Sequence, residues 1–196
     1  VEPMSNQALV DTIALELRQH YAQGARRLIL TPGNYGMEYL RRHGLDSLGI
    51  PAVRCSNFIG DALDAASGLG YEHILLVGHL GKLVKLAGGI MNTHSRQADC
   101  RRELICVHAA LAGASPSLLR ELMDCATTDA CVELLQKHSL REPVLEGLMT
   151  AIRDQLLRRV QGRSYVGAVV FSSAYGRLGI TPEAEIMLSA WTAGKE

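Results

Sequence analysis

His73-Ile74-Leu75-Leu76-Val77 is a short apolar run that opens directly into Gly78-His79-Leu80-Gly81-Lys82-Leu83-Val84-Lys85. The run predicts a buried strand, and the segment after it, through Ser95, predicts a ligand loop. This segment holds four glycines, two histidines and two lysines, whereas a plain connector needs about one glycine. Backbone amides and cations that meet at the end of a buried strand suit an anionic ligand.

Two similar units precede this stretch. A helix over about 6–23, with Ser5 as its cap, leads to a strand at 27–31 and a helix at roughly 35–43. A second strand at 52–55 leads to a helix that ends near Ser67. Continuous apolar strands that alternate with helices predict an α/β fold with an open, mostly parallel sheet flanked by helices.

The second half of the chain reads as mainly helical. Helices are expected over 96–112, 116–125, 128–138 and 142–161, with Ser115-Pro116 as a start signal. A late additional strand is expected at 165–171, followed by a hairpin turn over 172–179 and a last helix from Pro182 with Thr181 as its cap.

Composition narrows the class of function. The 196 residues suffice for a single α/β domain over 1–196, and 20 basic residues balance 20 acidic ones. We therefore expect no nucleic-acid or membrane partner, and any anion site must be local. Five cysteines without CxxC spacing favour reduced thiols, a cytoplasmic location and no protein metal site. The chain begins at Val1 without a methionine, which is expected of a processed chain or of a piece of a longer protein.

Three turns follow the three expected strands and should meet at one edge of the sheet. They begin at Thr31, Ser56 and Gly78. The third is not a phosphate loop of the Walker type, because Leu76 stands where the first glycine would be and Leu83 follows Lys82. The alternatives at the first two turns are a simple connector and an N-cap formed by Ser56 or Asn57, and both stay open. At the third turn the alternatives are structural histidines and a solvated basic face.

These turns carry a resemblance to a known family. The quoted blocks are Pro3-Met4-Ser5, Thr31-Pro32-Gly33-Asn34-Tyr35-Gly36, Ser56-Asn57-Phe58-Ile59-Gly60 and the segment from Gly78 to Ala87 with Asn92-Thr93-His94-Ser95. In this order they resemble the CbiD family of cobalt-precorrin-5B C1-methyltransferases. The resemblance is close over about 1–113 and looser beyond. Members of the family are considerably longer, so the chain is expected to be the C-terminal domain of a two-domain protein, with the missing N-terminal domain as a partner.

The resemblance implies methyl transfer from S-adenosylmethionine to C1 of a cobalt-corrinoid in cobalamin biosynthesis, with the cobalt belonging to the substrate. An in-line methyl displacement needs positioning more than a strong acid or nucleophile, which fits the lack of a catalytic triad. The alternative is a corrinoid-binding scaffold domain whose cofactor site lies in the missing domain. A homo-oligomer stays open.

The roles that follow from the resemblance are hypotheses. The catalytic candidates are His79 and His94. The expected cofactor-binding residues are Thr31, Gly33, Asn34, Gly36, Ser56, Asn57 and Gly60. The expected substrate-binding residues, which would face the acetate and propionate groups of the corrinoid, are Gly78, Gly81, Lys82, Lys85, Asn92, Thr93, Ser95, Arg96 and Arg101.

Overall fold

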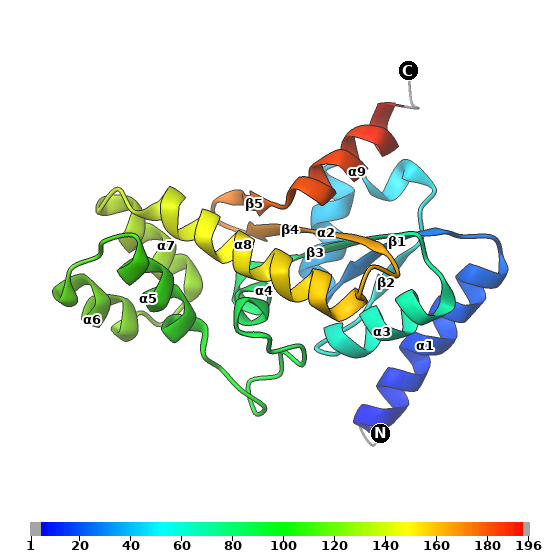
Figure 1. The fold of residues 1–196 in the computed structure, drawn as a ribbon, viewed down its shortest axis with the longest axis horizontal. Helices are drawn as coiled ribbons and strands as arrows, with labels where there is room; N and C mark the ends of the chain where they lie inside the picture. Colours follow the sequence, from blue (N-terminus) through cyan, green and yellow to red (C-terminus); the bar gives the residue numbers. More distant parts are fainter. Residues whose placement is uncertain (1–4, 194–196) are drawn as a thin grey trace.

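A computed structural model describes residues 5–193, and its centre is an open sheet in the strand order β2-β1-β3-β4-β5. The first four strands pair in parallel, whereas β5 runs antiparallel to β4. The expected α/β fold with a late additional strand is confirmed (Figure 1). The strands are β1 (Arg27–Thr31), β2 (Ala52–Arg54), β3 (His73–His79), β4 (Tyr165–Ser172) and β5 (Gly176–Ile180).

Helices cover both faces of the sheet because successive strand residues point to opposite sides. Leu28, Leu30 and Leu76 belong to the core cluster under α1 (Asn6–Ala22), α3 (Ile59–Leu69) and α8 (Arg141–Val160). The intervening Ile29, Leu75 and Val77 belong to a second cluster, shared with α2 (Asn34–Arg42) and α9 (Pro182–Thr192). In Figure 1, α2 and α9 lie on the side of the sheet opposite α1 and α3.

The strand order contains a point where the direction of winding reverses. From β1 the chain passes through α2 on one face to β2, then returns through α3 on the other face to β3, on the far side of β1. At such a switch point the loops at the carboxyl ends of the strands leave a crevice, which is where open α/β sheets bind ligands.

A long helical connection joins β3 to β4. It holds α4 (Leu80–Leu83), a 3₁₀ turn (Val84–Gly88), α5 (Arg101–Leu111), α6 (Pro116–Asp124), α7 (Thr128–Lys137) and α8. Helices α5 to α7 lie beyond one end of the sheet, and the long α8 returns across it (Figure 1). A shorter 3₁₀ turn, Asp46–Leu48, precedes β2.

Most expected boundaries and caps are confirmed. Ser5, Ser115 and Thr181 cap α1, α6 and α9 through side-chain oxygens that accept backbone N–H groups. The expected hairpin is formed by β4 and β5. Pro3 and Met4, which contribute to the first block of the resemblance, lie outside the described residues.

One local prediction is wrong, and one alternative left open by the sequence is excluded. The helix expected from residue 96 begins at Arg101, because Cys100 adopts a left-handed conformation (φ 51°) and the Arg96 N–H is bound by the His94 ring. Neither Ser56 nor Asn57 caps α3, whose N-cap is Phe58 without a side-chain hydrogen bond. The side chains of Ser56 and Asn57 are therefore not used to start a helix.

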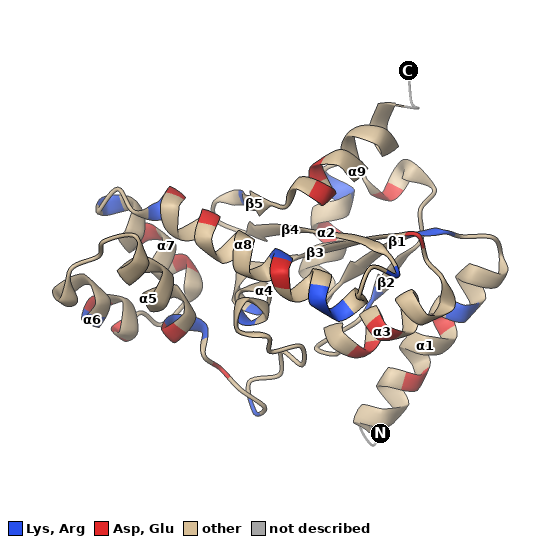
Figure 2. Cartoon of the chain, in the orientation of Figure 1, with Lys and Arg blue, Asp and Glu red and all other residues tan. Residues whose placement is uncertain are grey.

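Charge is dispersed over the chain. Basic and acidic residues are spread over many elements in Figure 2, in keeping with the balanced composition. Among the helices of residues 5–193, none is both long enough and apolar enough to cross a membrane.

Candidate functional site

The first loop of the switch point, between β1 and α2, brings backbone close to the crevice. Gly33 has a φ of 107°, which favours glycine, and the exposed Asn34 accepts a hydrogen bond from Arg54 at 3.1 Å. Gly36 has a packing role instead: a Cβ there would lie 2.6 Å from Thr31 Cβ and 3.0 Å from the Val77 carbonyl oxygen. Thr31 itself is fully buried, and its hydroxyl has no hydrogen-bond partner among residues 5–193.

The second and third loops are joined to each other. The Asn57 carbonyl accepts the Thr93 N–H at 2.9 Å, and the Thr93 hydroxyl donates to Asn57 Oδ1 at 3.2 Å. The Gly60 N–H donates to the Met91 carbonyl at 3.1 Å, and a Cβ at Gly60 would lie 2.8 Å from Met91 Cβ. Gly60 therefore allows the segment after the third strand to lie against the start of α3.

Lys82 connects all three loops. Its ammonium donates to the Ser56 carbonyl over a long 3.4 Å and lies 3.7 Å from the position of a Cβ on Gly33. Within residues 5–193 the structure records one hydrogen bond of the Lys82 ammonium, the one to Ser56. Two of its three N–H donors therefore remain for a ligand. Burial lowers the pKa of Lys82, the nearby Cys55 thiol opposes this, and Lys85 reinforces it. The prediction that the three turns meet is confirmed, and Lys82 stands at their meeting point.

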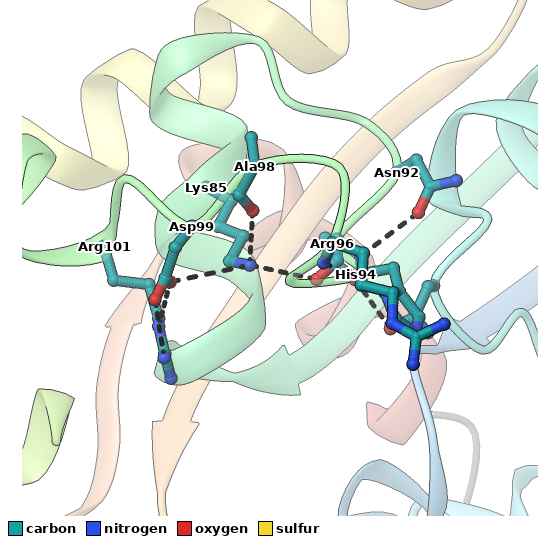
Figure 3. A network of polar contacts seen from close by, with 9 residues as sticks. Lys85, Asn92, His94, Arg96, Ala98, Asp99 and Arg101 are labelled. Atoms are coloured by element: carbon teal, nitrogen blue, oxygen red, sulfur yellow. Dashed lines mark hydrogen bonds and ion pairs between the residues drawn. The ribbon is translucent and has the colours of Figure 1, made fainter.

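Lys85 is engaged within the chain. Its side chain is 3% exposed, and its ammonium donates to the carbonyls of Thr93 at 3.1 Å and Ala98 at 2.8 Å (Figure 3). The third partner is the Asp99 carboxylate at 3.7 Å. Two hydrogen bonds and an ion pair therefore tie Lys85 to the loop after the third strand, and this geometry gives no support to a bond with a ligand carboxylate.

His79 ends β3 and faces several elements. Its Nδ1 accepts the Gly81 N–H at 3.1 Å, so the neutral ring carries its proton on Nε2 and is a donor there. Burial lowers the pKa of His79, and the Asp129 carboxylate on α7 opposes this. The ring contacts Phe171 edge to face at 5.8 Å between centroids and lies 6.0 Å from the ring of Tyr35.

Two cavities flank the first turn of α2. We call the first the α1 cavity, of about 310 Å³; it is bounded by one side of α1 and by Gly33, Asn34, Arg54 and Ser56. The second, the hairpin cavity of about 330 Å³, lies between α2 and the β4–β5 turn. Its lining residues are Tyr35, Glu38, Tyr39, Arg42, His43, Phe171, Ser172, Ser173 and Gly176.

Other predicted site residues lie apart from this crevice or pack within it. His94, Ser95 and Arg96 are exposed, and His94 bonds to its own loop through the Asn92 side chain and the Arg96 N–H (Figure 3). Arg101 binds the Asp99 carboxylate at 2.5 and 3.0 Å and lines a separate small cavity with Thr128.

The remaining predicted glycines serve packing. A Cβ at Gly78 would meet Pro32 and Leu83 at 2.9 Å, whereas Gly81 lies near Thr128 of α7. Within residues 5–193 no group of three metal-ligating side chains is placed to hold a metal ion.

Sequence reasoning missed Arg54, Tyr35 and Phe171. Arg54 is the last residue of β2, and Phe171 pairs in register with His79 near the end of β4. A signal was present, because the carboxyl ends of parallel strands share one edge and side chains there can be listed from the predicted strands.

Comparison with known proteins identifies the family that this chain resembles. Residues 92–182 match the family model described as CbiD, C-terminal domain. The resemblance to the CbiD family is confirmed. Curated relatives named cobalt-precorrin-5B C(1)-methyltransferase include those of Ruminiclostridium cellulolyticum (41% identical over 173 residues, 88% of this chain and 44% of the relative) and Alkaliphilus metalliredigens (36% over 189 residues, 96% and 49%). A third, from Listeria welshimeri, is 34% identical over 193 residues, 97% of this chain and 52% of the relative.

The chain thus spans about half the length of the curated relatives it matches. No solved structure matches it.

Proposed function

We propose that this chain provides the carboxyl-terminal part of an S-adenosylmethionine-dependent methyltransferase that methylates C1 of cobalt-precorrin-5B. The observation that carries the proposal is the convergence of three loops on Lys82 at the switch point, in a chain similar to relatives bearing that name. Methyl transfer to a ring carbon asks for positioning and exclusion of water, which a crevice of short polar groups and backbone supplies.

The α1 cavity fits the methyl donor. Its volume of about 310 Å³ lies at the lower end of the range for small-molecule sites. Gly33 exposes backbone, Asn34 and Ser56 offer neutral hydrogen-bonding groups, and Arg54 holds Asn34 in place. Of the residues expected to bind the cofactor, we retain Gly33, Asn34, Ser56 and Asn57, and we assign Thr31, Gly36 and Gly60 to packing beneath the loops.

The corrinoid substrate carries many carboxylates, and Lys82 is the cation best placed to bind one of them. Its spare donors and partial desolvation strengthen a charge-assisted hydrogen bond. His79 adds an Nε2–H donor at the same end of β3 rather than a ready base, because Nδ1 is already occupied by the Gly81 N–H. Lys85, Asn92 and Thr93 support the loop that presents these groups.

Titration calorimetry tests the proposal with S-adenosylhomocysteine, the product of the donor, and with cobyrinic acid, a corrinoid with free carboxylates. We expect both ligands to bind. The Lys82→Ala substitution should lower the affinity for cobyrinic acid by about tenfold, and this loss should be smaller at high salt. Lys137→Ala on the exposed face of α7 is the matched control.

Binding of corrinoid alone would favour a scaffold whose donor site lies in another part of the full-length protein. A folded chain that binds neither ligand would contradict the proposal.

A further inference from the structure

The hairpin cavity has no role in the site predicted from the sequence, although it opens beside His79. Its walls come from α2 and from the β4–β5 turn, and its lining includes the rings of Tyr35, Tyr39 and Phe171. Tyr39 stacks on Phe171 with ring centroids 4.4 Å apart and on His43 at 4.0 Å, so these three rings form a fixed wall. Phe171 and Tyr39 are buried, at 4% and 9% exposure.

Tyr35 differs from the rings of that wall. It is 65% exposed and stands in the first turn of α2, between the α1 cavity and the hairpin cavity. Arginines cover the rings of Tyr21 and Tyr175 at 4.0 and 5.6 Å, whereas the structure records no cation over Tyr35 in residues 5–193. With this exposure, the Tyr35 ring can stack on a flat ligand.

The size of the substrate limits how much of it the hairpin cavity can hold. A corrin ring with its side chains is larger than this cavity of about 330 Å³, so one edge of the ring fits the cavity and the rest lies over the first turn of α2, beside the methyl donor in the α1 cavity. The most exposed large apolar side chain on that turn is Tyr35. The hairpin cavity also offers polar groups that can hydrogen-bond to acyl side chains, with the exposed Ser173 and His43 among them.

We propose that the hairpin cavity is a corrinoid subsite, in which Tyr35 stacks against the macrocycle and the cavity receives side chains from one edge of the ring. The inference rests on the proposed function. It assigns the substrate contacts to α2 and the β4–β5 turn, whereas the sequence predicted them in the loop of residues 92–101.

Two corrinoids separate stacking from charge pairing. Cobyrinic acid has free carboxylates, whereas cobinamide carries amides in their place. We expect Tyr35→Ala to weaken the binding of both by roughly three- to tenfold, and Tyr35→Phe to restore it, because the stacking face is kept. Lys82→Ala should lower the affinity for cobyrinic acid and leave that for cobinamide unchanged. Affinities can be followed by the visible absorption of the corrinoid or by calorimetry.

A second variant tests the cavity without changing Tyr35. Ser173→Trp on the exposed turn should fill the mouth of the hairpin cavity and weaken both corrinoids. Tyr165→Ala is the matched control, because Tyr165 is partly exposed (39%) and stands at the amino end of β4, on the opposite edge of the sheet.

The outcomes separate this inference from the proposed function. If Tyr35→Ala and Ser173→Trp both bind corrinoids as well as the unmodified chain, while Lys82→Ala binds cobyrinic acid more weakly, the proposed subsite is wrong. The proposed function would still stand. Absence of corrinoid binding by the unmodified chain contradicts both. S-adenosylhomocysteine binding should be the same in Ser173→Trp and in the unmodified chain, which shows that the variant is folded.

Discussion

At the scale of single residues, two lysines three positions apart have different tasks. Lys82 keeps free donors at the crevice, whereas Lys85 is buried and satisfied by two carbonyls and a carboxylate. The sequence predicted that both bind the substrate. The difference arises because the segment after Gly89 folds back over Lys85, a contact between parts of the chain that local spacing does not reveal.

Lys85→Ala should therefore cost stability. The carbonyls of Thr93 and Ala98 would lose a buried donor, and a loss of about 1–3 kcal/mol in the free energy of unfolding is expected. Urea denaturation measures it, with Lys137→Ala as the exposed control. Equal stability of the two variants would show that the Lys85 network does not hold the loop.

The pKa of the His79 ring, measured by titration, tests which groups surround it. Burial disfavours the imidazolium, so its pKa should lie below the ordinary value of about 6.5. Asp129 favours the charged form, so Asp129→Asn should lower the pKa further. NMR titration of the ring protons measures both, and Glu133→Gln on the same helix should leave the value unchanged. A rise in the pKa in Asp129→Asn would contradict the assigned surroundings of His79.

At the scale of elements, the approach of α2 to the sheet depends on one glycine. A Cβ at Gly36 would lie 2.6 Å from Thr31 Cβ, whereas a Cβ at the exposed helical Gly68 would meet no atom of residues 5–193 within 4 Å apart from its chain neighbours and its own helix backbone. We expect Gly36→Ala to destabilise the chain by about 1–3 kcal/mol through overpacking. Gly68→Ala should be neutral or stabilising by up to about 1 kcal/mol. Thermal or urea unfolding compares the two, and a neutral Gly36→Ala would show that α2 can shift without loss.

Most elements were predictable because their signals are local. The apolar runs at β1 and β3 are continuous rather than alternating with polar residues, which is typical of strands buried on both faces. Capping side chains such as Ser115 and Thr181 mark helix starts. The start of α5 was not predictable, because it depends on a left-handed Cys100 and on hydrogen bonds within the preceding loop.

At the scale of the whole molecule, the crevice follows from topology. Parallel strands place the turns after β1, β2 and β3 at one edge, and this allowed their meeting to be predicted. The hairpin cavity depends on α2 lying beside the β4–β5 turn, a pairing of distant segments for which the sequence has no local pattern.

The central claim is that the switch-point loops bind the methyl donor. Chemical-shift mapping of backbone amides during titration with S-adenosylhomocysteine tests it most directly. The account predicts that the largest shifts cluster at Gly33 to Tyr35, at Ser56 and Asn57, and at Lys82. Saturable shifts confined instead to the separate cavity lined by Arg101 and Thr128, with these loops unchanged, would contradict it.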